Sequence, residues 1–125
     1  MIITGKIMVG LVALIHIYIV YLEMFAWSKP KGLRVFGMTQ EVADASKTLA
    51  ANQGLYNGFL AAGLIWGLVQ PNVNFGHQVV IFFLCTVIVA AIYGALTVKK
   101  SILFMQGLPA FIALILVVST YFPVT

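Results

Sequence analysis

The hydrophobic positions of the chain gather into four long stretches that are separated by three polar breaks. These stretches cover about residues 7–27, 49–69, 77–98 and 102–122. An α-helix needs roughly 20 residues to cross a bilayer at about 1.5 Å per residue, and each stretch is close to that length. The pattern therefore predicts an all-α polytopic membrane protein, a bundle of four transmembrane helices that forms a single domain over residues 1–125.

The polar breaks predict how the helices are connected. Residues 70–74 form a short uncharged turn, and residues 99–101 are short enough to make the last two helices an antiparallel hairpin. Residues 28–48 are the long connection. Within it Thr39 has the chemistry of a helix N-cap, so a helix that begins at Gln40 could run unbroken into the second stretch.

Composition makes a lipid bilayer the expected surroundings of this chain. Hydrophobic residues make up 62% of the 125 residues and charged residues only 8%, whereas a soluble domain is about one quarter charged. The net charge of +4 comes from seven basic residues, and nearly all of them flank the apolar stretches. This placement is typical of membrane orientation and argues against a nucleic-acid partner.

The charges in the loops predict a topology. Four crossings place the first and third connections on one side and both termini on the other. The first side holds six basic residues, and the second holds only Lys6. The positive-inside rule then places residues 28–48 and 99–101 in the cytoplasm and both termini outside it, as in a multi-pass protein of the cell inner (plasma) membrane. Any homo-oligomer should therefore be parallel.

Two ionisable residues lie inside the first apolar stretch. Glu23 is the only acidic residue outside the 28–48 loop, and His16 precedes it by seven residues. Seven residues bring the two side chains within about 20° of each other around a helix. Ionisable residues inside a membrane normally face protein and mark functional sites, because an acid at mid-helix costs roughly 2.5–3.5 kcal/mol. Glu23 and His16 are therefore candidates for ligand binding and for acid–base catalysis.

Further polar residues fall at a depth similar to that of Glu23. Counted from the predicted cytoplasmic ends of the helices, they lie within roughly 10 Å of the interface. Since a polar group in hydrocarbon needs a partner, we expect them to form one ligand-binding layer with Glu23. Taken singly, they could also be interhelical contacts or interfacial aromatic residues. The predicted layer consists of Trp27, Asn52, Gln53, Tyr56, Asn57, Tyr93 and Gln106.

Glycine and proline positions indicate how the helices pack. Gly54 and Gly58 form one G-x-x-x-G motif, and Gly63 and Gly67 form a second on another side of the same helix. Such motifs let backbones approach closely, so the second stretch is expected to be contacted on two sides, although the motifs could also serve a dimer. Pro109 should disturb the hydrogen bonding of the last helix near its cytoplasmic end.

Three sequence blocks carry a resemblance to a known family. They are EMFAW at residues 23–27, NQGLYNGFLAAG at residues 52–63 and QGLPA at residues 106–110. Over nearly its whole length the chain resembles small four-helix integral membrane proteins of bacteria and fungi that are catalogued as a domain of unknown function (DUF1304). The resemblance implies the same fold and the same membrane location, and some members of that family carry an epimerase label.

Three functions remain open at this point. The protein could bind or transport a small molecule or ion, with Glu23 as a protonatable site. It could be a membrane-embedded isomerase or epimerase in which His16 and Glu23 act as acid and base and Tyr56 or Asn57 orients the ligand. It could also be a structural or assembly subunit. The sequence has no Cys/His metal set, phosphate-binding glycine loop or serine-nucleophile motif, so no metal or other cofactor is expected.

Overall fold

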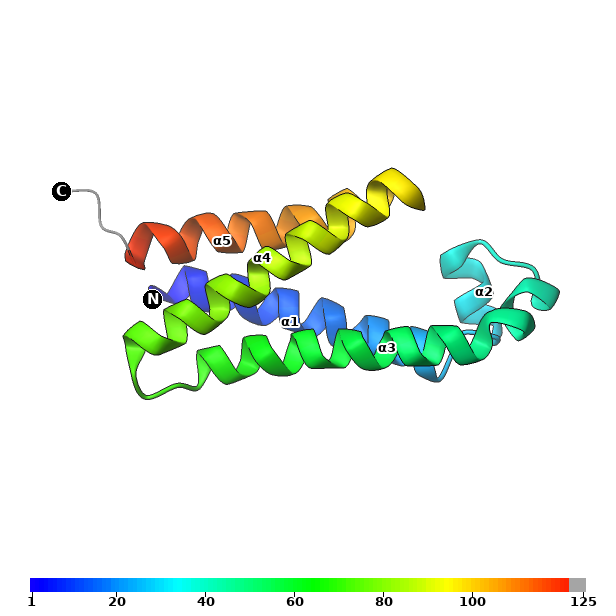
Figure 1. Cartoon of the computed structure of the whole chain (residues 1–125), viewed down its shortest axis with the longest axis horizontal. Coiled ribbons are helices and arrows are strands. Elements are labelled where there is room, and N and C mark those ends of the chain that lie inside the picture. Colours follow the sequence, from blue (N-terminus) through cyan, green and yellow to red (C-terminus); the bar gives the residue numbers. More distant parts are fainter. Residues whose placement is uncertain (122–125) are drawn as a thin grey trace. The chain divides into compact units, whose positions relative to one another are not determined.

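A computed structural model describes residues 1–121, and all the regular secondary structure in this range is helical (Figure 1). The predicted all-α class is therefore confirmed. Phe122, the last residue of the fourth predicted stretch, lies outside the described range. The elements in chain order are α1 (Ile3–Met24), α2 (Pro30–Phe36), α3 (Gln40–Leu68), α4 (Val73–Thr97), the π-helix η1 (Leu103–Gly107) and α5 (Leu108–Tyr121).

Three segments within the described range are long and apolar enough to cross a membrane. They are α1 with 22 residues, α4 with 25 residues and the segment Leu103–Tyr121 with 19 residues. They correspond to the first, third and fourth predicted stretches and give the chain the features of a membrane protein. The second stretch falls in α3, where the amides and glycines of residues 52–58 lower the hydropathy. A fourth crossing stays a prediction.

Helix ends lie several residues away from the predicted boundaries. α1 ends at Met24, three residues before the predicted end, because the amides of Phe25 and Ala26 both donate to the carbonyl of Tyr21, at 3.0 and 3.1 Å. α4 begins at Val73, before the predicted residue 77, because the side chain of Asn72 caps its first turn. Local hydrogen bonds, which hydropathy does not register, set both ends.

The long connection contains more helix than the sequence indicated. α3 starts within it and runs unbroken for 29 residues, and the Thr39 hydroxyl accepts a hydrogen bond from the Val42 amide at 3.3 Å, so both predictions are confirmed. The short helix α2 was not predicted. It begins with Pro30, which has the φ angle that a first helical turn needs. It ends at Phe36 and is capped by Gly37, which adopts a left-handed φ of 62°.

Contacts divide the chain into two compact units. Unit 1 contains Met1–Leu14 and the chain from Leu60 onward, and unit 2 contains Ile15–Phe59. The helices α1 and α3 contribute residues to both units.

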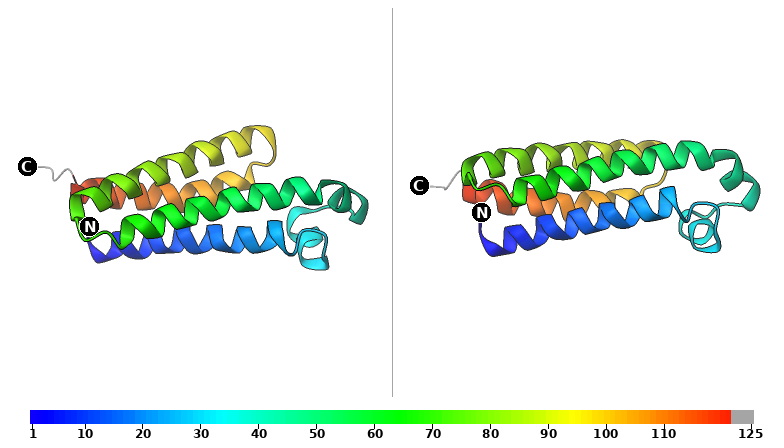
Figure 2. Two further views of the ribbon diagram at one scale, coloured as in Figure 1. Left: turned by 60° about the horizontal axis from the view of Figure 1, so that its bottom comes forward. Right: turned by 90° about the horizontal axis from the view of Figure 1, so that it is seen from below.

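Unit 1 is held together by an apolar core. α4 and α5 lie side by side and run antiparallel, as predicted for the last two helices (Figures 1 and 2). Glycines let the end of α3 approach α4, since a Cβ added at Gly67 would lie 2.5 Å from Val80 Cγ2 and one added at Gly63 would overlap the ring of Phe83. The core residues are Val9, Val12, Ala13, Leu64, Val80, Leu84, Val87, Ala110, Ala113 and Val117.

The last helix of unit 1 is irregular, as Pro109 predicted. The π-helix η1 ends two residues before Pro109, and the Leu108 amide donates to the carbonyl of Leu103, five residues back. A π-helical turn re-pairs the backbone groups that proline would otherwise leave unbonded. Gln106 lies within this turn and is half-buried.

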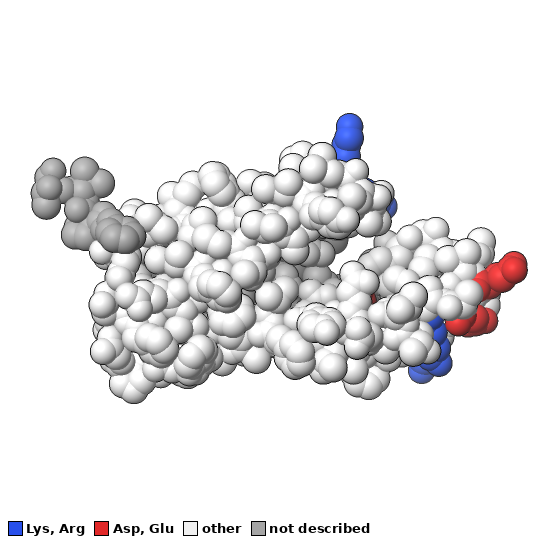
Figure 3. Space-filling model, viewed as in Figure 1, with Lys and Arg blue, Asp and Glu red and all other residues white. Residues whose placement is uncertain are grey.

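Charged side chains avoid the sides of the long helices. On the face shown in Figure 3 they lie over the connection after α4, around the beginning of α3 and near the connection between α1 and α2. The sides of the long helices on this face are almost free of them. This distribution is expected of helices whose sides contact lipid.

Candidate functional site

The two ionisable residues of α1 are both buried, as the sequence predicted. Glu23 lies in the last full turn of the helix and is 5% exposed, and His16 is 1% exposed. Their separation of seven positions corresponds to about 10 Å along the helix axis. Burying either side chain without hydrogen-bond partners would cost several kcal/mol, so their surroundings within unit 2 decide what they can do.

The side chain of Asn57 is the hydrogen-bond donor that the structure shows for Glu23. Its Nδ2 atom donates to Glu23 Oε1 at 2.6 Å and to the carbonyl oxygen of Gln53 at 3.3 Å. The first bond joins the end of α1 to the middle of α3. The sequence predicted amide and phenol donors from three helices around Glu23, whereas this hydrogen bond comes from α3.

A glycine makes the approach of α3 to Glu23 possible. A Cβ added at Gly54 would lie 2.7 Å from Met24 Cγ and 3.0 Å from Glu23 Cβ, closer than ordinary van der Waals contact. At Gly58 an added Cβ would lie 3.6 Å from Val20 Cγ2, which is an ordinary contact. The first G-x-x-x-G motif therefore packs α3 against α1, with Gly54 directly beside the acid.

Trp27 is tied to the connection after α1. Its indole Nε1 donates to Ser46 Oγ at 3.0 Å, and its ring packs at 4.7 Å between centroids against Phe36 of α2. Ser46 in turn donates to the carbonyl of Val42 at 2.7 Å. These contacts explain why Trp27 is half-buried. Its side chain lies between α2 and the first turns of α3 and contacts both.

The remaining predicted residues of α3 point outward. Asn52, Gln53 and Tyr56 are exposed, Tyr56 by 60%. The ring of Tyr56 packs edge-on against Phe59. Among the polar residues predicted on the second stretch, Asn57 alone is turned inward in the described structure, so the amide layer is smaller than the sequence suggested.

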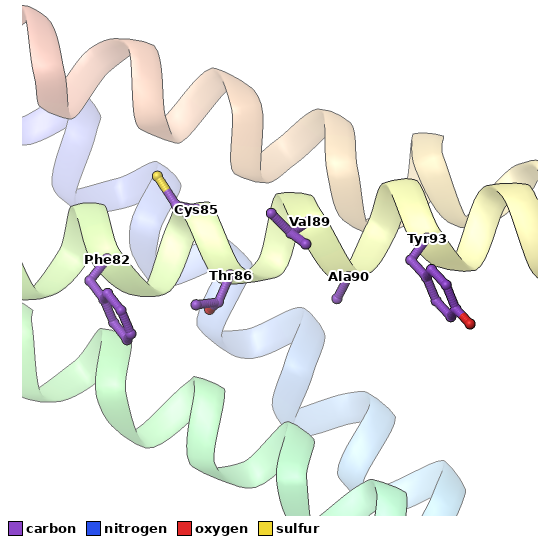
Figure 4. Close-up of a pocket in the computed structure, with 6 residues that line it drawn as sticks. All are labelled: Phe82, Cys85, Thr86, Val89, Ala90 and Tyr93. Carbon is purple, nitrogen blue, oxygen red and sulfur yellow. The ribbon is translucent and has the colours of Figure 1, made fainter.

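Tyr93 and Gln106 belong to unit 1, and their place relative to Glu23 stays a prediction. Tyr93 is 69% exposed and lies at one end of an open groove of about 500 Å³ along α4. The side chains that line this groove all come from that one helix (Figure 4). They are Phe82, Cys85, Thr86, Val89, Ala90 and Tyr93.

The sequence reasoning missed a polar cluster in unit 1 around His77. This residue is 3% exposed, and its Nδ1 atom lies 2.8 Å from the carbonyl oxygen of Val73. Its Nε2 atom lies 3.4 Å from Thr120 Oγ1, and its ring stacks on Tyr121 at 5.4 Å between centroids. The signal available in the sequence was a second histidine at the start of an apolar stretch.

The described residues offer hydrogen-bonding chemistry and no metal cluster. Within residues 1–121 no three His, Cys, Asp or Glu side chains lie close enough together to hold a metal ion. In the same range every fully buried side-chain nitrogen or oxygen has a hydrogen-bond partner. The Glu23–Asn57 pair is thus a satisfied polar contact that carries one titratable group.

Comparison with known proteins identifies the family. Residues 10–118 match the family described as "Protein of unknown function (DUF1304)". The uncharacterized protein YpaA of Lactococcus lactis subsp. lactis is 42% identical over 107 residues, which cover 84% of this chain and 88% of the relative. No solved structure matches the chain. The chain belongs to the DUF1304 family of proteins of unknown function, as its sequence blocks indicated.

Proposed function

We propose that the protein binds or transports a small molecule or ion within the membrane and that Glu23 is its protonatable site. The observation that carries this proposal is the buried contact between Glu23 and Asn57 on a neighbouring helix, at 2.6 Å. Acidic residues inside membrane helices are costly, and they commonly belong to ion pathways and proton relays.

The choice of a carboxyl group at residue 23 supports this proposal over a purely structural role. Asn57 needs only an acceptor oxygen opposite its Nδ2 atom, and the amide oxygen of a glutamine would accept the same hydrogen bond. A carboxyl group adds the ability to release and take up a proton and to bind a cation. Helix packing alone does not require either ability.

The topology proposed with this function has four crossings in one transmembrane domain of the inner (plasma) membrane. The six basic residues of the first and third connections support a cytoplasmic location for residues 28–48 and 99–101 and an external location for both termini. α3 would supply the fourth crossing, since its 29 residues correspond to about 43 Å, more than a bilayer's hydrocarbon thickness. Any homo-oligomer would then be parallel.

The test is flux in proteoliposomes that contain the purified protein. Proton flux would be followed with an enclosed pH-sensitive dye under an imposed pH gradient, and sodium flux with a radioactive tracer. We expect the Glu23→Gln variant to lose the flux of the wild type, because it keeps the hydrogen bond and loses the titratable group. Glu41→Gln is the matched control, since Glu41 is an exposed acid at the start of α3. Equal fluxes in wild type and Glu23→Gln would refute the proposal.

The burial of His16 on the same helix supports a second candidate, an isomerase or epimerase that acts on an amphiphile. A separation of about 10 Å along the axis leaves room for a small substrate between an acid and a base. Epimerisation through proton removal would incorporate solvent deuterium at the reacting carbon. Incubating a membrane lipid extract with the protein in D₂O, followed by mass spectrometry, should then show deuterium uptake that His16→Gln abolishes. Uptake equal to that of a protein-free sample would eliminate this candidate.

A further inference from the structure

The surface formed by α2 and the adjoining end of α1 is rich in basic side chains. Three basic residues, Lys29, Lys31 and Arg34, lie within six positions, and residues 24–40 contain no acidic residue. All three side chains are exposed. The nearest acid along the chain after α2 is Glu41, in the first turn of α3.

α2 is held in a defined position against the end of α1. Gly32 is buried, and a Cβ added there would overlap the carbonyl oxygen of Ala26 and lie 2.5 Å from that of Trp27. On the same side of α2, Phe36 packs against the ring of Trp27. Figures 1 and 2 show α2 at the end of unit 2 where α1 finishes and α3 begins. The opposite side of α2, with Lys31 and Arg34, therefore faces outward in a fixed orientation.

Aromatic side chains of α1 continue this positive surface. The ammonium group of Lys31 lies 5.2 Å from the centre of the Tyr18 ring, a distance at which a cation and an aromatic face attract each other. Tyr18 and Tyr21 share one face of α1, three residues apart, and Phe25 lies directly after the end of this helix. The three side chains are exposed by 44, 47 and 65%. Because α1 is apolar enough to cross a membrane, this face meets the bilayer at the level where aromatic residues concentrate.

We propose that Lys31 and Arg34 bind the phosphate of an anionic phospholipid whose acyl chains lie against Tyr21 and Phe25. The two cations are three residues apart on the exposed side of a helix, so both can reach one phosphate group. A lipid satisfies the cations and the neighbouring apolar surface together. A nucleic acid or an acidic peptide would leave Phe25 and the tyrosine rings uncovered.

Native mass spectrometry of the protein in detergent micelles tests this proposal. The protein would be titrated with dioleoyl phosphatidylglycerol and, separately, with zwitterionic dioleoyl phosphatidylcholine. We expect saturable binding of the anionic lipid and about thirtyfold weaker binding by Lys31→Gln/Arg34→Gln, since each basic residue near an anionic membrane surface contributes about fivefold. The control Lys99→Gln/Lys100→Gln removes the same charge from the other loop and should change binding by less than about threefold. Equal losses in the two double variants would overturn the proposal.

Two further measurements keep the proposal falsifiable if the double variant folds poorly. Lys31→Arg/Arg34→Lys preserves the charge and should retain the binding of the wild type. In a Trp66→Phe background, bilayers with brominated phosphatidylglycerol should quench Trp27 more strongly than bilayers with brominated phosphatidylcholine, because Trp27 is only two residues from Phe25. Equal quenching by the two lipids would overturn the proposal. If millimolar glycerol 3-phosphate displaced the bound phosphatidylglycerol, the site would bind a free phosphate group and the proposal would also be overturned.

Discussion

Replacing Asn57 by alanine should reveal how much the buried acid depends on its partner. The change removes the amide that donates to Glu23 Oε1 at 2.6 Å. The Glu23 side chain, which is only 5% exposed, is then left without that donor. A buried acceptor that loses its donor costs about 1–3 kcal/mol. Measured polar contacts in membrane proteins average about 0.6 and reach about 1.7 kcal/mol. The two ranges overlap between about 1 and 1.7 kcal/mol, which is the loss of unfolding free energy that we expect.

A double-mutant cycle isolates this pair from other effects of the substitution. In a Glu23→Leu background residue 23 needs no donor, so Asn57→Ala should then cost less than about 0.5 kcal/mol. Glu23→Gln alone should also cost less than about 0.5 kcal/mol, because its amide oxygen accepts the same bond. Asn52→Ala, an exposed asparagine on the same helix, is the matched control and should be close to neutral.

Reversible unfolding in mixed micelles with increasing dodecyl sulfate, followed by circular dichroism, measures these free energies. We expect a coupling free energy of about 1 kcal/mol between residues 23 and 57. If Asn57→Ala costs the same with glutamate or leucine at residue 23, the contact has no energetic value and the proposed site loses its structural basis. The same conclusion follows if Asn52→Ala is as costly as Asn57→Ala.

Three further substitutions test the packing described above in the same unfolding assay. Gly32→Ala should destabilise the protein by about 1–3 kcal/mol, because the new methyl group meets backbone carbonyls of the preceding turn. Gly10→Ala, inside α1 and with no atom within 4 Å of its added Cβ, should be neutral or stabilising by up to about 1 kcal/mol. Similar losses of stability in the two variants would contradict this. Trp27→Phe keeps the ring contact with α2 and loses the hydrogen bond to Ser46, so we expect a loss of about 0.5–1.5 kcal/mol that disappears in a Ser46→Ala background. His77→Leu should cost about 1–2 kcal/mol through the lost ring hydrogen bonds, and an unchanged midpoint would show that the cluster does not support unit 1.

Local patterns in the sequence were sufficient for the helical class and for several details. The long apolar stretches predicted α1, α4 and the last helical segment, and Thr39 predicted the start of α3 at Gln40. The glycine spacing predicted that α3 is approached on two sides, which Gly54 and Gly67 confirm in their respective units. The burial of Glu23 also followed from sequence, because an acid in an apolar helix has to face protein.

The identity of the partners depended on tertiary structure. Asn52, Gln53 and Asn57 are equivalent in the sequence pattern, yet only the last is turned toward Glu23, because Gly54 fixes which side of α3 meets α1. The orientation of α2, with its cations on the outward side, likewise depends on the contact of Trp27 with Phe36. Hydrophobic periodicity is a property of residues that are close in sequence, so it can be recognised in the sequence itself. The contacts of Glu23 and Trp27 join residues that are distant in sequence. They depend on how one packed helix is rotated against another, which the sequence pattern does not specify.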